Sequence, residues 1–162
     1  MGKEKIISYY PYKKEINKMF KEDQDMRFSG NWDSSVDKRN FPKVKDIFEK
    51  IGVPTISKVG EKASQSFIIL VIHQDKNVSF QETFLKEAKK EKEDLQLSTL
   101  AHLEDRVLVN KGMKQIYGSQ VNSNTLKPYP IKDEKNVDKL RAEVGLEPLD
   151  KYLKGFENED IS

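Results

Sequence analysis

The longest apolar run in the chain covers residues 67–72 and follows a stretch in which apolar residues recur at helical spacing. Ala63, Phe67 and Leu70 repeat every three to four residues before the run becomes apolar on all sides. This pattern predicts a buried helix, because a surface helix keeps a polar face. A short buried strand is the alternative, since Ile and Val are abundant in the run. Three polar residues, at positions 73–75, follow directly, so a polar cluster ends the most hydrophobic segment.

Apolar residues recur at helical spacing in further segments on both sides of this run. The helices expected there cover about residues 11–29, 37–51, 79–94 and 98–111, with a shorter pair at 137–144 and 148–153. Pro11 suits the start of the first helix, and Pro42 fits only the first turn of the second. Ser57 is the expected N-cap of the central helix, and Ser98 that of the helix ending at Gly112.

Two short extended segments, MKQIYGSQV and LKPYPI, are joined by the polar turn VNSNT. They predict a small β-hairpin near residues 114–131, in which Pro128 and Pro130 confine the second strand to an edge. The expected fold is therefore mainly α, a single-domain helical bundle with one hairpin. The expected divisions are an N-terminal arm at 1–10, the helical domain at 11–156 and an acidic tail at 157–162.

The composition narrows the classes of protein that this chain can belong to. Lys and Arg total 29 and Asp and Glu total 27, interspersed, which is not the concentrated basic face of a nucleic-acid-binding protein. The chain has no cysteine, so disulfides, thiolate catalysis and cysteine-type zinc sites are excluded. No run approaches the ~18 apolar residues of a membrane span. We therefore expect neither nucleic acid nor membrane as a partner, and a cytoplasmic location.

His73 and Asp75 are the first candidates for chemistry. A histidine with a carboxylate two residues later, at a helix end, has the composition of a general base with its orienting acid. In the alternative interpretation, His73 hydrogen-bonds the last carbonyls of its helix and Asp75 begins the next turn. On a helical wheel His73 falls beside Ile69 and Leu70, which predicts that it is enclosed.

The helix ending near residue 111 carries a second group of charges. Glu104 falls within its apolar stripe and Asp105 at the edge of the stripe, so at least one of them is expected to meet an Arg or Lys. Asp105 and Arg106 either orient a substrate or join Asp23 and Arg27 in a buried ion-pair network.

Other kinds of site find weaker support in the sequence. His73, Asp75, Asp105 and Asp23 form a mixed imidazole and carboxylate set, but no familiar metal-ligand spacing appears. The chain has no glycine-rich phosphate loop and no serine elbow. We therefore assign no metal ligands and no cofactor.

Four stretches, taken in order, resemble a family of small bacterial proteins classed as a domain of unknown function. They are GVPTISKVG, IHQD with the later FQ, LAHLEDRVLVNKG with QIYGSQ, and PYPIKDEKNVDKLRAEVGLEPLDKY. The resemblance covers residues 23–152 and implies no activity. The recurring polar positions that it implies are Arg27, His73, Asp75, Gln81, Asp105, Arg106, Tyr117 and Gln120. His102 stands where the resemblance implies an aromatic residue, often Tyr.

Together these features predict a polar pocket centred on His73. The leading hypothesis is a small hydrolase or acid–base enzyme that acts on an anionic small molecule. The catalytic residues would be His73, Asp75 and Asp105, and the substrate-binding residues Arg27, Gln81, Arg106, Tyr117 and Gln120. The alternative is a non-catalytic module that sequesters a small anionic ligand or a protein partner. The pattern assigns no oligomeric state.

Overall fold

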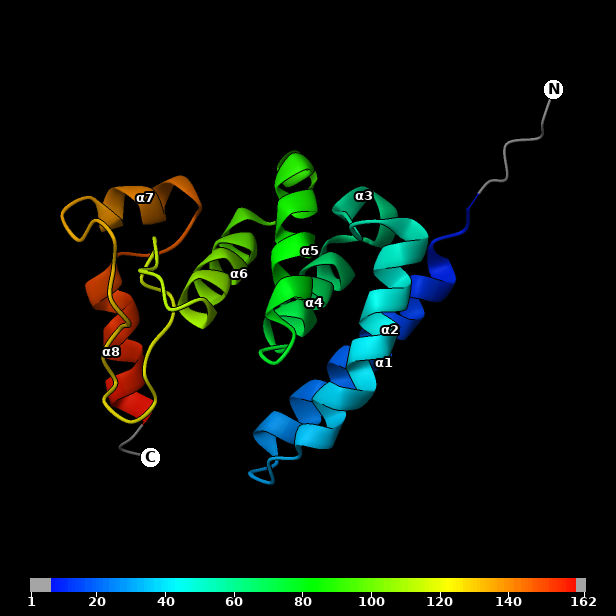
Figure 1. The fold of residues 1–162 in the computed structure, drawn as a ribbon, viewed down its shortest axis with the longest axis horizontal. Helices are drawn as coiled ribbons and strands as arrows, with labels where there is room; N and C mark the ends of the chain where they lie inside the picture. Colours follow the sequence, from blue (N-terminus) through cyan, green and yellow to red (C-terminus); the bar gives the residue numbers. More distant parts are fainter. Residues whose placement is uncertain (1–6, 160–162) are drawn as a thin grey trace.

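The computed structural model describes residues 7–159, and within them the chain forms eight α-helices and one 3₁₀ turn, η1 (Figure 1). These elements are α1 (Tyr10–Phe28), α2 (Ser34–Ile51), α3 (Ile56–Val59), α4 (Glu61–Ile72), α5 (Val78–Lys90), η1 (Lys92–Asp94), α6 (Leu97–Asn110), α7 (Val137–Glu143) and α8 (Leu149–Glu159). In Figure 1, α1 and α2 lie on one side, α4 to α6 in the middle, and α7 with α8 on the other side. The prediction of a mainly α fold is confirmed.

The helix ends depend on local chemistry that the periodic pattern does not contain. Asp33 caps α2 by accepting a hydrogen bond from the Ser35 amide at 2.9 Å, so α2 begins three residues before the predicted residue 37. Pro42 consequently lies well inside α2, and its predicted place in the first turn is wrong. The helix continues past Pro42 although the proline supplies no amide donor.

The central segment is helical as predicted, but it is interrupted once. Gly60, at φ +86°, separates the short α3 from α4. Ser57 does not cap the helix as predicted; its amide and hydroxyl instead hydrogen-bond the carboxylate of Asp94 in η1. Ser98 does not cap α6 either, because Gln96 precedes the helix and accepts a hydrogen bond from Thr99 at 2.7 Å.

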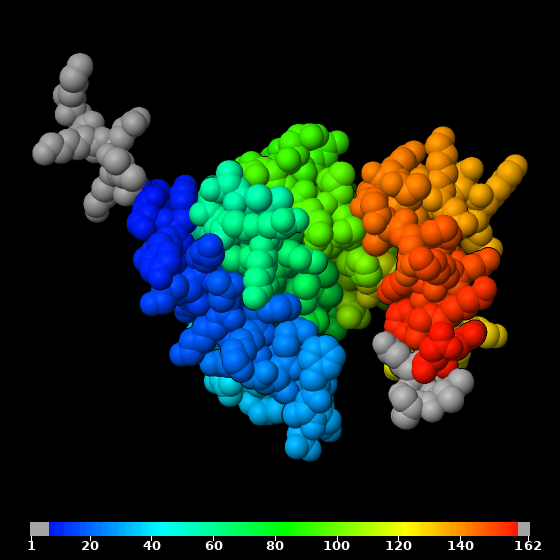
Figure 2. Space-filling model, turned by 180° about the vertical axis from the view of Figure 1, so that it is seen from behind, coloured from blue at the N-terminus to red at the C-terminus, as the bar shows by residue number. Residues whose placement is uncertain are grey.

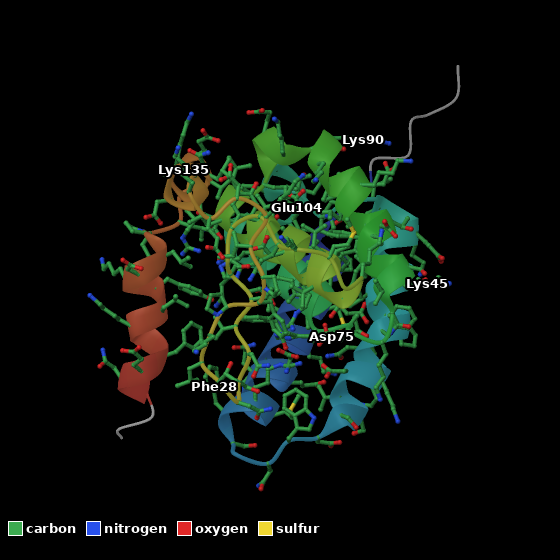
Figure 3. The ribbon with its side chains drawn as sticks, turned by 60° about the vertical axis from the view of Figure 1, so that its left-hand side comes forward. Phe28, Lys45, Asp75, Lys90, Glu104 and Lys135 are labelled. Atoms are coloured by element: carbon green, nitrogen blue, oxygen red, sulfur yellow. The ribbon has the colours of Figure 1, made fainter. Side chains whose placement is uncertain are left out.

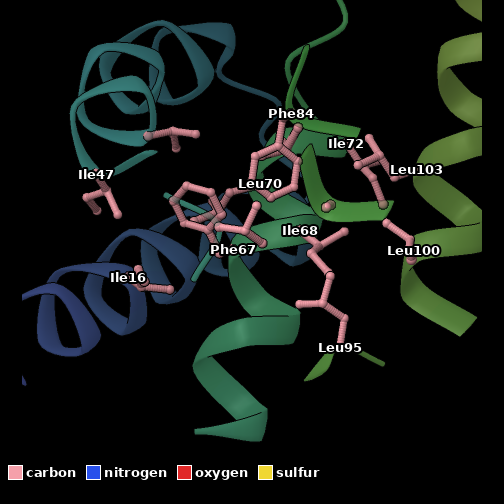
Figure 4. Close-up of a cluster of buried hydrophobic side chains, with 14 of the residues drawn as sticks. Ile16, Ile47, Phe67, Ile68, Leu70, Ile72, Phe84, Leu95, Leu100 and Leu103 are labelled. Carbon is pink, nitrogen blue, oxygen red and sulfur yellow. The ribbon is translucent and has the colours of Figure 1, made fainter. Parts of the chain in front are cut away.

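One hydrophobic cluster, drawn in Figure 4, joins α1 to α6. Its centre is α4, where Phe67 packs near Phe84 of α5 with the ring centroids 5.5 Å apart. The predicted burial of residues 67–72 is confirmed except at Ile69, which is half-buried. The last member along the sequence is Val107, so the C-terminal third of the chain contributes nothing to this cluster.

Residues 113–136 contain no β-strand, so the predicted hairpin is wrong. Gln115 pairs with Ile131 in parallel orientation and Val121 with Pro128 in antiparallel orientation, as two isolated bridges. The prolines at 128 and 130 have no amide to donate to a ladder. The Gln115 side chain occupies part of the space between the segments, donating to the carbonyls of Gln120 and Tyr129 and accepting from the Gln120 amide.

The predicted domain divisions are only partly within the described residues. The arm and the tail extend to residues 1–6 and 160–162, which lie outside them, and α8 continues to Glu159. Among residues 7–159, no helix has both the length and the apolarity needed to cross a bilayer.

Candidate functional site

His73 directly follows α4 as its C-cap residue, and its side chain contacts α1. Its Nδ1 lies 3.0 Å from Oδ1 of Asp23, which is completely buried. An ionised carboxylate only accepts hydrogen bonds, so Nδ1–H of His73 is the donor. Nε2 of the same ring remains available for another partner. The hypothesis that His73 bonds the last carbonyls of its helix is wrong for the side chain. Gln81 binds those carbonyls instead, donating Nε2 to Val71 and Ile72 at 3.0 and 3.1 Å.

Asp23 is held by three side chains. Arg27 donates Nε to the same Oδ1 at 3.0 Å, and Gln24 donates to Oδ2 at 2.8 Å. Burial by itself raises the pKa of Asp23, but the His73 hydrogen bond and charge, with Arg27 and Gln24, lower it below its ordinary value. A buried aspartate with these partners stays ionised and fixes the His73 imidazole in one orientation.

Arg27 connects this pair to the surface. Its Nη2 donates to Oδ1 of Asp37 at 2.9 Å, and its guanidinium lies over the ring of Trp32, 4.7 Å from the centroid. Burial raises the pKa of Asp37, although the nearby charges of Arg27 and His73 oppose that rise. Asp23 and Arg27 pair as expected, but the network includes His73 and Asp37 in place of the expected Asp105 and Arg106.

Asp75, predicted to orient His73, is exposed and has other partners. Asn110 donates to its Oδ1 at 3.1 Å, and Nε of Arg106 lies 3.5 Å from the same oxygen. That Arg106 Nε is buried and has no hydrogen-bond partner among the described residues. The Asn110 amide also donates to Gln81 at 3.1 Å, so Gln81 reaches the site only through Asn110.

A cavity of about 330 Å³ lies beside these groups, between the α1–α2 turn, the segment after α4, and α6. We call it the His73 pocket. Its charged and aromatic lining residues are Arg27, Trp32, Asp37, Lys38, His73, Asp75, Lys76 and Arg106. Figure 3 labels Asp75 near the centre of the molecule, above the end of α1 that carries Phe28. Four of the lining side chains are cationic and two are carboxylates, which favours an anionic occupant.

Asp105, predicted as catalytic, does not line the His73 pocket. It is completely buried on the other side of α6 and accepts hydrogen bonds from the amides of Ile116, Tyr117 and Ser119, at distances from 2.8 to 3.2 Å. The Ser119 hydroxyl adds a fourth donor at 2.8 Å. Every donor belongs to one loop, so this carboxylate fixes the loop to α6.

Tyr117 and Gln120 also lie away from the His73 pocket. Gln120 donates to the carbonyl of His102 and to the Ser119 hydroxyl, at 3.3 and 3.0 Å. Tyr117 lines a different cavity with Glu104, and Glu104 pairs with Lys89 as the buried-stripe argument predicted. His73 therefore shares its pocket with Arg27, Asp75 and Arg106 of the predicted set, and with none of the loop residues.

Sequence analysis did not identify Asp23 as the partner of His73. The two residues are 50 positions apart, and only the fold brings α1 against the end of α4. The available signal was a carboxylate on the apolar face of α1, four residues before Arg27. Within residues 7–159, no group of three or more His, Asp or Glu side chains is arranged to hold a metal ion.

Fold and site together define a mainly helical protein with a cationic cavity beside a half-buried histidine that is paired with a buried aspartate. The chain belongs to a family of unknown function (DUF6624), whose model matches residues 30–160. His73 and Arg106 lie within the matched region, whereas Asp23 and Arg27 precede it. Comparison with curated proteins gave no match, and comparison with solved structures gave none either.

Proposed function

We propose that the protein is an acid–base enzyme that hydrolyses a small anionic molecule in the His73 pocket. The observation that carries this proposal is the contact between His73 Nδ1 and the buried Asp23 carboxylate. A carboxylate at Nδ1 selects the tautomer in which Nε2 accepts a proton, and it stabilises the imidazolium that forms. Nε2 of His73 makes no hydrogen bond to any other residue in the described range.

The lining of the pocket supports an anionic substrate. Arg106 offers a guanidinium whose Nε lacks a hydrogen-bond partner, at 3.5 Å from Asp75. The Arg106 side chain as a whole is 30% exposed, so part of its guanidinium is accessible to an anionic ligand in the pocket. Arg27 is already engaged by Asp23 and Asp37, so its contribution is positive potential rather than direct binding.

Water is the nucleophile that fits this arrangement. No Ser or Thr hydroxyl hydrogen-bonds His73 within residues 7–159, so His73 has no hydroxyl there to activate for covalent catalysis. In the proposed step, Nε2 takes a proton from a water molecule while that water attacks the substrate. The proton is then delivered to the leaving group, which closes the balance of the hydrolysis.

Two measurements on the native protein test the proposal. Native mass spectrometry identifies any anion that co-purifies, and release of nitrophenolate from p-nitrophenyl phosphate measures hydrolysis. His73→Gln is expected to lower kcat about a hundredfold or more while the protein remains folded. Arg106→Gln is expected mainly to raise KM, because it removes binding to the anionic group.

Arg39→Gln is the matched control, because Arg39 is exposed on α2 and lines no described cavity. It should leave both constants unchanged. Hydrolysis by His73→Gln at the wild-type rate would contradict the proposed role of His73. Binding of an anion without any turnover would instead favour the sequestering module, with the same pocket and no chemistry.

A further inference from the structure

A second and larger cavity, of about 580 Å³, adjoins the same histidine. We call it the Arg141 pocket. It lies between α4, α6 and the turn joining α7 to α8, and its lining includes Ile69, His73, Ser98, His102, Arg141 and Tyr152. In Figure 2, α7 and α8, drawn in orange and red, lie at one side of the molecule beside the green helices.

The two pockets share His73, and we call the two together the groove. On α4, Gln65, Ile69 and His73 follow at intervals of four residues, so they share one face, and His73 lines both pockets. On α6, His102 lines the Arg141 pocket and Arg106 lines the His73 pocket. These two residues are also four apart, which places them one turn, about 6 Å, from each other.

Arg141 brings a buried cation to the far end of this groove. Its side chain is 1% exposed. Nε donates to the carbonyl of Glu147 at 2.6 Å, Nη1 donates to the carbonyl of Tyr117 at 2.7 Å, and the guanidinium lies 4.8 Å from the centroid of the Tyr152 ring. Burial lowers its pKa, although distant carboxylates oppose the shift.

The charge of Arg141 has no direct counter-charge. No carboxylate among residues 7–159 comes within 4.0 Å of its nitrogens, and Nη2 donates no hydrogen bond there. Buried charges in proteins are ordinarily paired, so a desolvated guanidinium beside a cavity favours an acidic ligand. Backbone carbonyls accept hydrogen bonds from the Arg141 guanidinium but carry no net charge, so its positive charge is not neutralised by them.

We propose that the groove binds an elongated small molecule with an acidic group at each end, one at Arg106 and the other at Arg141. The middle of this molecule crosses His73, so the bond to be hydrolysed lies between the two acidic groups. Ile69, Ile72 and Leu146 give the Arg141 pocket an apolar wall that suits a hydrocarbon spacer. This inference rests on the proposed function and specifies its substrate class.

The two histidines of the chain provide two readouts, because His73 lines both pockets whereas His102 lines only the Arg141 pocket. Linear α,ω-dicarboxylates of increasing length are titrated into the full chain, with the monocarboxylate of each length as the reference. Imidazole NMR signals of His73 and His102 are followed and assigned with His73→Gln and His102→Phe. A dicarboxylate of matching length should shift both histidines and bind about tenfold more tightly than its monocarboxylate, since a charged hydrogen bond contributes about 1.5 kcal/mol.

Ser98→Asp tests the Arg141 end without removing Arg141, whose loss would free two backbone carbonyls. Ser98 is the second residue of α6, where an added carboxylate is favoured by the helix dipole. It should weaken the dicarboxylate to the affinity of the monocarboxylate and leave the monocarboxylate unchanged. Ser79→Asp makes the same change at the second residue of α5, outside the groove, and should change neither affinity.

The outcomes separate this inference from the proposed function. Equal affinities of the two ligand types, with only His73 responding, would overturn the two-ended substrate and leave the His73 pocket as an anion site. A Ser98→Asp variant that binds the dicarboxylate as the wild type does would also overturn it. Nitrophenolate release that depends on His73, together with no response of His102 to any dicarboxylate, would keep the enzyme and reject the second subsite.

Discussion

Two aspartates, Asp23 and Asp105, are completely buried, and each is stabilised in a different way. Asp23 is bound by the Arg27 guanidinium and the His73 imidazole, at 3.0 Å each. Asp105 accepts only amide and hydroxyl hydrogens from one loop. The contacts of Asp23 leave the polarised imidazole of His73 at a cavity, whereas the contacts of Asp105 hold the backbone of a loop in place. Burial of a carboxylate therefore identifies neither a catalytic nor a structural role until its donors are known.

Asp23→Asn should lower the free energy of unfolding at neutral pH by about 3 kcal/mol, because it leaves Arg27 without its buried counter-charge and weakens the hydrogen bond with His73. The effect should depend on pH. The folded-state pKa of Asp23 is lowered, so its contribution is complete above the unfolded value of about 3.9 and is lost as the pH falls through the folded value. Urea titrations at several acidic pH values should show the wild-type and variant stabilities converging. A constant difference down to strong acid would contradict this assignment.

His102 should give a second pH effect at a higher range. Burial lowers the pKa of His102, while the charge of Asp105 opposes the shift. The folded protein thus favours the neutral form of His102. The contribution of His102 to the free energy of unfolding is complete above the unfolded pKa of about 6.5 and is lost as the pH falls below that value. His102→Phe keeps an aromatic ring against Tyr152 and removes the titration. As the pH is lowered from about 7.5 to about 5, the free energy of unfolding of this variant should rise relative to that of the wild type, as measured by chemical denaturation.

At the scale of the helix, periodicity predicted which segments are helical but not how each helix begins. The buried positions of α2 and α4 repeat as the sequence indicated. The predicted N-caps Ser57 and Ser98 are wrong. Ser57 binds Asp94, 37 positions away, and the residue in the N-cap position of α6 is Gln96. A capping residue type is a local signal, whereas its actual partner is set by tertiary packing.

Pro42 is the clearest opportunity for stabilisation in a single element. It occupies the interior of α2 and is exposed, so an alanine there would restore one helical hydrogen bond and remove a steric conflict without disturbing the core. Pro42→Ala should raise the free energy of unfolding by about 1–3 kcal/mol. Pro11→Ala, in the first turn of α1, should change it by less than about 0.5 kcal/mol. Equal changes in the melting temperature of the two variants would contradict the claim that Pro42 destabilises the interior of α2.

The segment 113–136 shows where sequence patterns fail. Alternating apolar residues and turn residues predicted strands, yet Gln115 and Asp105 satisfy the backbone groups that a ladder would have used. Gly118 is required at one point: its φ is +69°, and a Cβ there would lie 2.9 Å from Cδ1 of Ile131. Side chains from distant positions make the hydrogen bonds that a β-ladder would have made, and no local sequence pattern indicates such long-range partners.

At the scale of the whole molecule, the protein consists of two parts held by different forces. The hydrophobic cluster extends from Ile16 to Val107. The C-terminal part is attached to α6 through Asp105, which accepts hydrogen bonds from the loop amides, and through Gln120, which donates to the carbonyl of His102 at 3.3 Å. The Arg141 pocket lies at this junction.

Amide hydrogen exchange should therefore distinguish the two parts. The amides of α7 and α8 are expected to exchange through openings of lower free energy than those of α4, because few apolar contacts oppose their release. Asp105→Asn should lower the free energy of those C-terminal openings by a further 1–3 kcal/mol or so, since it weakens the loop anchor, and should affect α4 less. Uniform protection across both parts would mean that the chain opens as one unit.

The candidate site was predictable in part. His73, Asp75, Arg27 and Arg106 share a pocket, as their polar character beside apolar segments indicated. Asp105 did not join them, because one residue along a helix is a rotation of about 100°, which turns Asp105 away from the face of Arg106. Arg141 was not singled out at all, since nothing in its local sequence shows that its charge is buried without a carboxylate.

Trp32 is the one tryptophan in the chain, and it lines the His73 pocket with the guanidinium of Arg27 against its ring. The intrinsic indole fluorescence of the native protein consequently arises from a single known position at the mouth of the candidate site. A ligand that draws Arg27 away, or places an anion near the ring, would change the wavelength or intensity of that emission. Occupancy of the pocket can thus be followed optically in the unlabelled protein, with any library of compounds.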